Sequence, residues 1–229
     1  MIPWLERGSP FPPVTKALRS PNGLLCAGDE LTPGRILEAY ARGIFPWFSE
    51  GDPVLWWSPD PRMVLFPAEL RVTRSLRKRA ASGRFEVRFD TAFTEVMRAC
   101  AEPRDGQAGT WILPPMIAAY TRLHEMGFAH SAEAWRDGAL VGGLYGMLLG
   151  RVFFGESMFA RETDASKVAL VHLVKRLEAM GVVLIDCQQA TGHLASLGAR
   201  EIPRRDFVRH LAESIQYPLA GTPLADPRG

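Results

Sequence analysis

Apolar and polar residues alternate through three consecutive segments in the middle of the chain. The segments are "AHSAEAWR" at 129–136, "ALVGGLYGMLL" at 139–149 and "VFFGESMFA" at 152–160. This two-residue period is typical of β-strands, because successive side chains point to opposite faces of a sheet. Asp137-Gly138 and Gly150-Arg151 separate the segments and are turn signals. The pattern therefore predicts three consecutive antiparallel strands.

A helical spacing follows these strands. Between residues 164 and 181, apolar residues recur every three or four positions. Asp164 or Thr163 is expected to cap the start of this helix, and Gly181 to end it. Further helices are predicted at 91–101, 114–127 and 203–215, a strand at 182–188, and a short helix or turn at 191–199.

The first 62 residues differ from the rest of the chain. They are rich in proline, glycine and tryptophan, which break up regular structure, apart from a short helix with Thr32 as its cap and Pro33 at its first position. We expect a small irregular N-terminal domain at 1–62 and a second domain at 63–229. The second has the order of elements seen in acetyltransferase-like folds. The predicted fold class is therefore α/β, with a mainly antiparallel central sheet flanked by helices.

The composition excludes several classes of protein. Of the 229 residues, 47% are hydrophobic and 23% are charged, as in ordinary globular proteins. No run of about 18 apolar residues predicts a membrane span, and the N-terminus does not resemble a secretory signal. Cys26, Cys100 and Cys187 have no metal-ligand spacing. We expect a cytoplasmic protein with free thiols and no structural metal.

Nucleotide and cofactor motifs are missing as well. The chain has neither a GxxxxGK[ST] loop nor a GxGxxG after a strand, so nucleotide hydrolysis and dinucleotide redox chemistry have no support. An acetyl-CoA site would be expected to have a glycine-rich loop at a helix N-terminus, but "ARETDASK" contains no glycine. Ser157 lacks the G-x-S-x-G setting of a serine hydrolase. No cofactor is expected.

The stretch 71–88 is strongly basic, although the net charge of the chain is only +2. Glu86 is the single acid in this stretch, so its cations could attract a polyanion such as a nucleic acid. A solvated helix surface is the alternative. The cations are Arg71, Arg74, Arg77, Lys78, Arg79, Arg84 and Arg88.

Two predicted strands place acids among apolar residues. Strict alternation puts Phe154, Glu156 and Met158 on one face of their strand, and Asp186 and Gln188 on one face of theirs. If the strands are neighbours, two carboxylates and an amide converge in an apolar pocket, which is the usual composition of a small-molecule site. The alternatives are that Glu156 pairs with an arginine and that Asp186 caps the following loop.

Several strings between residues 21 and 207 together resemble one family, the leucyl/phenylalanyl-tRNA–protein transferases. The strings are "GIFPWF", "LWWSPDPR", "GTWI", "AHSAEAW", "LVGGLYG", "FFGESMF", "DASKVAL", "LIDCQ" and "HLASLGAREIPR". The resemblance implies a monomer with a small N-terminal domain and an acetyltransferase-like domain. It implies transfer of leucine or phenylalanine, and methionine less well, from aminoacyl-tRNA to the N-terminal arginine or lysine of a protein, which marks that protein for degradation. An aminoacyl ester is already activated, so this reaction needs no metal or ATP.

The resemblance also implies roles for individual residues. Asp186 and Gln188 match the proposed catalytic pair, and which of them handles the proton stays open. Glu156 would pair with the α-ammonium of the donor amino acid. The residues implied to bind the donor are Glu156, Met158, Met147, Leu170, Trp111, Trp47 and Tyr40. The basic stretch would bind tRNA phosphates through Arg71, Arg74, Arg77, Lys78, Arg79 and Arg84.

The chain departs from the family pattern at two places. It has "AGDEL" at 27–31 where relatives usually have "GGDL", and Ala160 where they usually have serine. Neither departure touches Asp186 or Gln188, although Ala160 could affect donor selectivity. The rival functions are an acetyl-CoA-dependent N-acetyltransferase and a non-catalytic tRNA-binding module.

Overall fold

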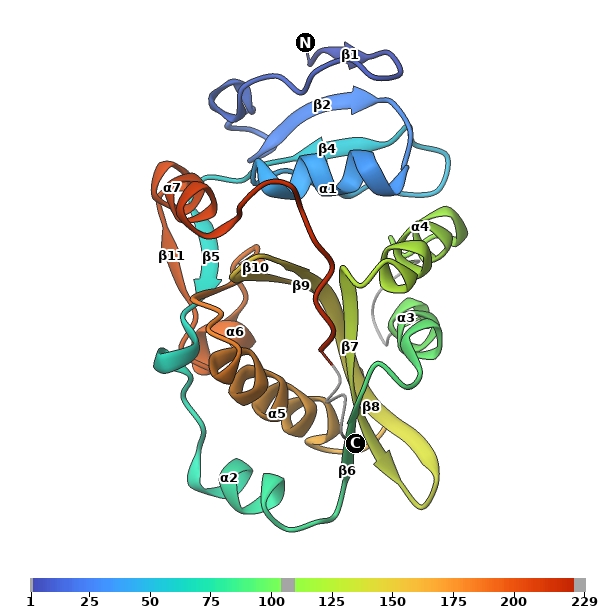
Figure 1. Cartoon of the computed structure of the whole chain (residues 1–229), viewed down its shortest axis with the longest axis vertical. Helices are drawn as coiled ribbons and strands as arrows, with labels where there is room; N and C mark the ends of the chain where they lie inside the picture. Colours follow the sequence, from blue (N-terminus) through green and yellow to red (C-terminus); the bar gives the residue numbers. More distant parts are fainter. Residues whose placement is uncertain (1, 104–109, 225–229) are drawn as a thin grey trace.

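Two β-sheets organise the computed structural model, which describes residues 2–103 and 110–224 (Figure 1). The smaller sheet lies at the top of Figure 1 and has four strands in the order β1-β2-β4-β3. Its strands are β1 (Trp4–Leu5), β2 (Leu24–Gly28), β3 (Phe45–Pro46) and β4 (Leu55–Trp57).

The larger sheet has seven strands in the order β11-β5-β10-β9-β8-β7-β6. They are β5 (Arg62–Leu65), β6 (Glu86–Phe89), β7 (Ala129–Arg136), β8 (Ala139–Leu149), β9 (Val152–Ala160), β10 (Leu184–Gln188) and β11 (Arg200–Ile202). Strands β7, β8 and β9 pair antiparallel in sequence order, as predicted. Of the neighbouring pairs in this sheet, only β9–β10 is parallel, so the expected mainly antiparallel sheet is confirmed.

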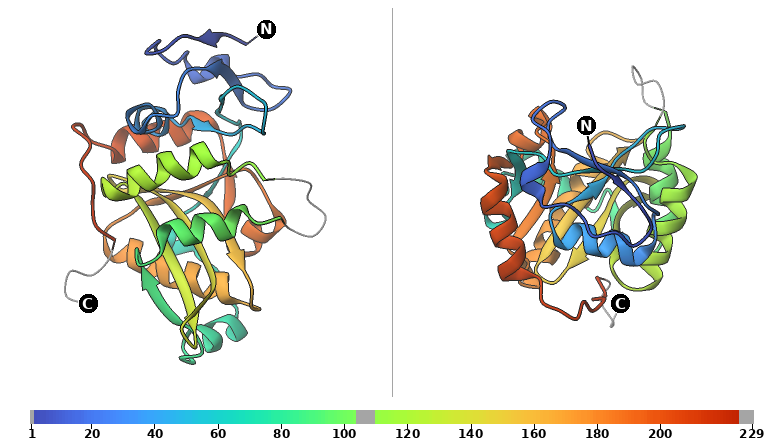
Figure 2. Two further views of the ribbon diagram at one scale, coloured as in Figure 1. Left: turned by 90° about the vertical axis from the view of Figure 1, so that its right-hand side faces the viewer. Right: turned by 90° about the horizontal axis from the view of Figure 1, so that it is seen from above.

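Helices cover both faces of the larger sheet. The helices are α1 (Pro33–Ala41), α2 (Arg74–Ala80), α3 (Phe93–Ala101), α4 (Pro114–Glu125), α5 (Ala165–Ala179), α6 (Gly192–Ser196) and α7 (Arg204–Ser214), with 3-10 turns η1 (Val14–Lys16) and η2 (Pro67–Glu69). One apolar cluster joins α1, α3, α4 and α7 to the face that carries Phe154 and Tyr145, and a second joins α2 and α5 to the face that carries Phe153 and Leu144. In the left view of Figure 2, α3 and α4 lie in front of the strands and α5 lies behind them. No helix in the described part of the chain has the length and apolar character needed to cross a membrane.

The two helix caps that the sequence predicts turn out differently. The Thr32 hydroxyl accepts a hydrogen bond from the backbone N–H of Arg35 at 3.3 Å, so the predicted cap of α1 is confirmed. Asp164 directly precedes α5, but its backbone is left-handed, with φ of 69°, and its side chain caps nothing. Its carboxylate lies instead 3.7 Å from Lys167 and 3.7 Å from Arg79. Asp164 thus occupies the N-cap position of α5, but its side chain contacts two cations instead of capping the helix.

The small N-terminal sheet and the larger sheet lie on either side of Arg62 in the sequence. All strands of the small sheet precede Arg62, where the first strand of the large sheet begins. The domain boundary at this point stays a prediction. Helix α1 packs against the large sheet, and the ring of Tyr40 contacts Phe154 edge-on with 5.0 Å between centroids. Residues from the N-terminal part therefore reach the centre of the molecule.

Candidate functional site

A cavity of about 380 Å³ opens where β9 and β10 diverge. The two strands pair as parallel neighbours from Val152 opposite Leu184 to Phe154 opposite Asp186, and no ladder continues beyond that point in the described residues. Residues that follow on both strands line the cavity, together with side chains from α5, α6 and the segment before α4. Among them are Glu156, Met158, Leu170, Trp111, Gln188 and His193. The divergence thus creates a mostly apolar hollow with a few polar groups.

A β-bulge at Glu156 changes the side-chain pattern of β9. Tyr145 on β8 lies opposite Ser157, and Gly146 lies opposite Gly155, so Glu156 is an extra residue without a partner across the ladder. Phe154 consequently packs on the face covered by α3 and α4, whereas Met158 packs on the opposite face. The prediction that Phe154, Glu156 and Met158 share one face is wrong, because a bulge resets the alternation.

A second bulge has the same effect in β10. Asp186 lies opposite Val64 and Gln188 lies opposite Met63, so Cys187 is the extra residue. Gln188 has a left-handed backbone with φ of 61°. It lines the cavity, whereas Asp186 is fully buried outside the cavity wall. The prediction that Asp186 and Gln188 point to the same side is therefore also wrong.

The three groups nevertheless belong to one hydrogen-bonded chain. The Gln188 side-chain amide donates to Glu156 Oε1 at 3.0 Å, and the Gln188 backbone N–H donates to Asp186 Oδ1 at 2.9 Å. Arg62 donates to both oxygens of Asp186, from Nε at 2.8 Å and from Nη2 at 2.7 Å. Gln188 thus joins a carboxylate in the cavity wall to a buried ion pair behind it.

Arg62 is a site residue that sequence reasoning did not single out. Both Arg62 and Asp186 are fully buried, and the guanidinium also donates to the Gly43 carbonyl at 3.2 Å. It lies over the rings of Phe45 and Phe207, at 4.8 and 4.6 Å from their centroids. The alternative that Glu156 pairs with an arginine is therefore wrong in the described residues, because the arginine pairs with Asp186. Asp186 also accepts the backbone N–H of Gln188, as the alternative of a loop cap at Asp186 predicts. The only hint in the sequence was the string "LWWSPDPR", which ends at Arg62.

Glu156 has hydrogen bonds but forms no ion pair in the described part of the chain. Its Oε1 accepts from the Tyr40 hydroxyl at 2.7 Å, and Tyr40 is 2.5 Å from the Tyr120 hydroxyl. In the described part of the chain, no lysine, arginine or histidine forms an ion pair with Glu156. Burial, and next the negative charge of Asp186, raise the pKa of Glu156 to about 8, against the opposing effects of its hydrogen bonds and of the more distant charge of Arg62. A ligand with a positive charge at this point would stabilise the ionised carboxylate.

The other predicted donor-binding residues fall into two groups. Trp111, Met158 and Leu170 line the cavity. Met147 does not, because it is fully buried on the opposite face of the sheet, and its predicted place in the cavity wall is wrong. Trp47 lies outside the wall and is 39% exposed.

Tyr40 reaches the site through its hydrogen bond to Glu156 rather than through the cavity wall. Trp47 is held by Trp57, whose ring N–H donates to the Trp47 carbonyl at 2.6 Å. Ala160, one of the two departures from the family pattern, is exposed at the end of β9 and also lies outside the wall. The cavity itself is therefore built without these three side chains.

The basic stretch divides into paired and unpaired cations. Arg79 lies 3.7 Å from Asp164, and Arg84 lies 3.1 Å from Glu162. Four cations are exposed and have no acid within ion-pairing distance in the described residues: Arg71, Arg74, Arg77 and Lys78. These four, on and just before α2, are named the α2 cations below.

Sequence reasoning also passed over His193, which comes from α6. It lines the cavity together with Gln188 and Thr191, which precede it in the sequence. Burial, and then the positive charge of Lys167, lower the pKa of its imidazole below the usual 6.5. Its signal was present in the string "HLASLGAREIPR", but a lone histidine without ligand spacing is not informative by itself.

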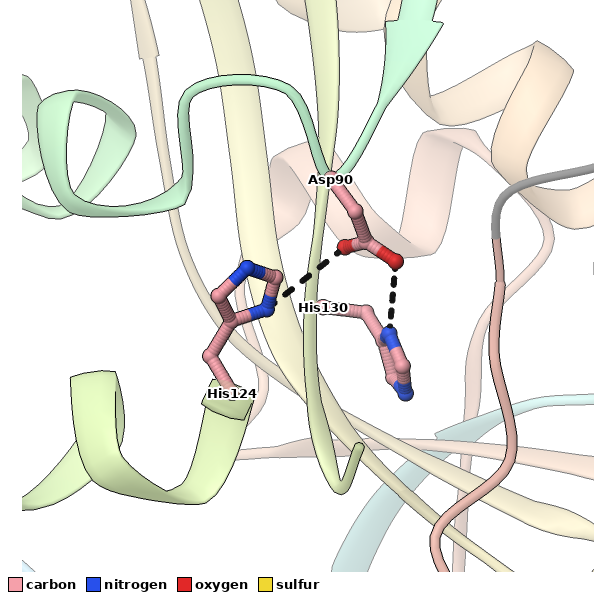
Figure 3. Close-up of side chains that lie close together, drawn as sticks. All are labelled: Asp90, His124 and His130. Carbon is pink, nitrogen blue, oxygen red and sulfur yellow. Dashed lines mark hydrogen bonds and ion pairs between the residues drawn. The ribbon is translucent and has the colours of Figure 1, made fainter. Parts of the chain in front are cut away.

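Asp90, His124 and His130 form a second polar cluster, shown in Figure 3. Their possible ligand atoms lie within 4.8 Å of one another. However, His124 Nδ1 is 2.8 Å from the Ala129 carbonyl, and His130 contacts Asp90 at 2.9 Å and the Gly127 carbonyl at 3.2 Å. Carbonyl oxygens only accept, so the ring nitrogens facing them carry hydrogens. The cluster is best explained as hydrogen bonds that tie the ends of β6, α4 and β7 together.

Two family models match the chain. The one described as leucyl/phenylalanyl-tRNA protein transferase covers residues 64–212, and the one for the N-terminal domain of the same transferase covers residues 29–60. The chain belongs to this family. The resemblance found in the sequence is thereby confirmed, and the protein is a transferase.

Individual relatives agree with the family models. The chain is 64% identical to a leucyl/phenylalanyl-tRNA–protein transferase of Nitrosospira multiformis, over 95% of this chain and 94% of that one. It is 62% identical to one of Chromobacterium violaceum, with the same two coverages. Among solved structures, a GCN5-related N-acetyltransferase from Kribbella flavida is similar with a TM-score of 0.40 and 11% identity, over 74% of this chain and 60% of that one.

Proposed function

We propose that this transferase moves leucine or phenylalanine, and methionine less well, from aminoacyl-tRNA to the N-terminal arginine or lysine of a protein. The observation that carries the proposal is the Glu156–Gln188 pair in the wall of a mostly apolar cavity, in a chain of this family. The new N-terminal residue would mark the acceptor for degradation. We further propose that the enzyme acts as a monomer in the cytoplasm.

The donor amino acid has two features that the cavity matches. Its α-ammonium would pair with Glu156, which has no cation of its own in the described structure. Its apolar side chain would enter between Met158 and Leu170. A flexible methionine in the wall tolerates both leucine and phenylalanine. Differences of one branch or methylene discriminate by only about 1–3 kcal/mol, so selectivity among apolar donors is modest.

Gln188 would position the reacting groups rather than exchange protons with them. Its amide donates to Glu156, and its backbone N–H is fixed by Asp186. Because Asp186 is locked to Arg62, the ion pair holds Gln188 in its left-handed conformation next to the cavity. We therefore assign Asp186 and Arg62 as positioning residues. Holding ester and amine in the right geometry supplies on the order of 7 kcal/mol in favourable cases.

The tRNA would approach from the side of α2. The α2 cations form no ion pair among the described residues, so they are available for phosphates. Arg79 and Lys167 both contact Asp164, and this group links α2 to the first turn of α5, whose Leu170 lines the cavity. Trp111 in the cavity wall and the partly exposed Trp47 would stack on the terminal adenosine.

Transfer of a labelled residue tests the proposal. Purified protein is mixed with tRNA charged with labelled phenylalanine and a peptide that begins with arginine. We expect label in the peptide, and none in a matched peptide whose N-terminus is acetylated, because the attacking amine is blocked. Tight tRNA binding without transfer would favour the non-catalytic module, and turnover of acetyl-CoA with the same peptide in the absence of tRNA would favour an acetyltransferase.

A further inference from the structure

The inference below rests on the proposed function and concerns the proton that aminoacyl transfer must move. When the acceptor amine attacks the ester carbonyl, an N–C bond forms and the C–O bond to the 3′-oxygen of the tRNA breaks. The nitrogen loses a proton and the departing oxygen gains one. A single group that accepts the first proton and returns it to the oxygen balances the reaction without a co-reactant.

The catalytic pair implied by the sequence does not supply such a group. Both oxygens of Asp186 accept hydrogen bonds from Arg62, and the carboxylate is fully buried outside the cavity wall. The Gln188 amide is not a base near neutral pH. Glu156 is taken up by the donor ammonium under the proposed function, and its Oε1 already accepts two hydrogen bonds.

Two further titratable side chains line the cavity but stay protonated. Burial raises the pKa of the Cys187 thiol and of the Tyr145 hydroxyl well above their ordinary values. Neither loses its proton at neutral pH, so neither accepts one from an amine. Within the described wall of the cavity, this leaves His193.

His193 has the position and the state that the reaction requires. It lines the same cavity as Gln188 and is exposed enough for a substrate amine to reach it. Its backbone carbonyl accepts from Ser196, whereas no hydrogen bond ties its ring in residues 2–103 and 110–224. Because burial and Lys167 lower the pKa of the imidazole, the neutral ring with a free lone pair is the main form at pH 7.

We propose that His193 is the proton-transfer residue of this enzyme. It accepts the proton of the attacking amine and donates it to the 3′-oxygen as the C–O bond breaks, so it ends the cycle as it began. In the described residues, the charged and titratable groups that act on it or line the same cavity are Lys167 on α5, Tyr145 on β8, Glu156 on β9 and Cys187 on β10. With donor ammonium paired to Glu156, none of these competes for the proton.

Two donors separate proton transfer from tRNA binding: phenylalanyl-tRNA and 3′-O-phenylalanyl adenosine, which has no phosphate. The wild type, His193→Gln and His193→Ala are assayed with a peptide that begins with arginine. We expect kcat to fall about 100-fold or more with both donors, the size typical of a lost acid–base group. The donor KM should change by less than about threefold, because ground-state binding is kept. Added imidazole should restore part of the activity of His193→Ala. In the wild type, protonation of the histidine should lower kcat/KM toward acid pH, and this fall should be absent in His193→Gln.

His210→Gln is the matched control, because its ring packs on Phe66, with 5.7 Å between centroids, outside the cavity wall. It should keep wild-type rates. A loss seen only with the tRNA donor would overturn the proposal and make His193 a phosphate contact, and an unchanged kcat would overturn it outright. Imidazole rescue distinguishes proton transfer from a structural role. If the wild type transfers from neither donor, the proposed function itself fails, which is a different result from a defect confined to the variants.

Discussion

Glu156 and Asp186 lie on neighbouring strands, yet their carboxylates have opposite surroundings. Asp186 is inside the paired part of β9–β10 and receives Arg62 on both oxygens. Glu156 is just beyond the point of divergence and has hydrogen bonds from Tyr40 and Gln188, but no cation in the described structure. A buried acid that has its counter-ion becomes strongly destabilising when that partner is removed, whereas a buried acid without one is a candidate place for a cationic ligand.

The largest effect is expected when Asp186, the acid that is paired with an arginine, loses that partner. Arg62→Ala leaves Asp186 buried and unpaired, which typically costs about 3–5 kcal/mol. We expect the free energy of unfolding, measured in urea, to decrease by this amount. Transfer activity should fall as well, because Gln188 loses the fixed carboxylate that holds its backbone N–H.

Asp186→Asn in the Arg62→Ala background is the matched control. It removes the unpaired charge, so it should recover part of the lost stability but not the activity. An Arg62→Ala protein as stable as the wild type would show that Asp186 does not depend on this pair.

The second prediction concerns Glu156, the acid without an ion-pair partner in the described residues. Glu156→Gln keeps the size of the side chain but removes the counter-ion of the donor ammonium. A hydrogen bond to a charged group is worth about 1.5–3 kcal/mol, so we expect the donor KM to rise roughly 10- to 100-fold. Glu125→Gln, an exposed glutamate on α4 paired with Arg122, is the control and should leave donor kinetics unchanged. Equal donor KM values for Glu156→Gln and the wild type would contradict the proposed ammonium site.

The same acid predicts how stability depends on pH in the absence of donor. The pKa of Glu156 is about 8 in the folded protein, above the ordinary value of 4.5. Between these values the unfolded chain has released a proton that the folded chain keeps. The contribution of this group to stability therefore decreases as pH rises from about 5 to 8, and does not change further at higher pH.

Glu156→Gln should remove this slope and be more stable than the wild type at pH 9 by about 1 kcal/mol or more. Urea unfolding at pH 5, 7 and 9 measures the difference. Parallel pH curves for the two proteins would show that the carboxylate is not desolvated. Phenylalanyl adenosine should stabilise the wild type more than the variant, because its ammonium pairs with Glu156.

The smallest effect is expected at the surface, far from either acid. Replacing Arg74, Arg77 and Lys78 by alanine should raise the KM for phenylalanyl-tRNA and reduce the slope of log affinity against log salt by about 2, since each lost phosphate contact contributes about 0.7–0.9. The phosphate-free donor should be unaffected. Arg79→Ala with Arg84→Ala is the control, because both side chains already have acidic partners. Equal salt slopes for the triple variant and the wild type would place tRNA elsewhere.

The sequence predicted the elements better than the direction of individual side chains. The strands at 129–160 and the cap at Thr32 follow from local patterns, and both are confirmed. Alternation then failed at Glu156 and at Cys187, because one extra residue in each strand resets the period of two. Gly155 in "FFGESMF" is a residue type that often marks a bulge, but it does not show which residue is the extra one, and "LIDCQ" has no such signal.

Met147 is an example of a side chain whose direction was predicted wrongly. A methionine near the predicted pocket is a plausible wall residue, but Met147 lies on the far side of the sheet from Met158 and Leu170. Arg62 shows the opposite case. It is separated from Asp186 by 124 positions, so the pair that fixes the site is invisible to any local pattern.

By itself, the sequence determined the family, the order of strands and helices from 129 to 188, and the kinds of groups at the site, because these depend on local pattern and on recognisable strings. The four-stranded sheet within residues 1–62 was not predicted. Only the tertiary structure decided which acid is neutralised and which is left without a cation. That outcome depends on where two neighbouring strands stop pairing and on an arginine that is 124 positions away in the sequence. Both are properties of the folded molecule, since burial and distance set the free energy of each charge.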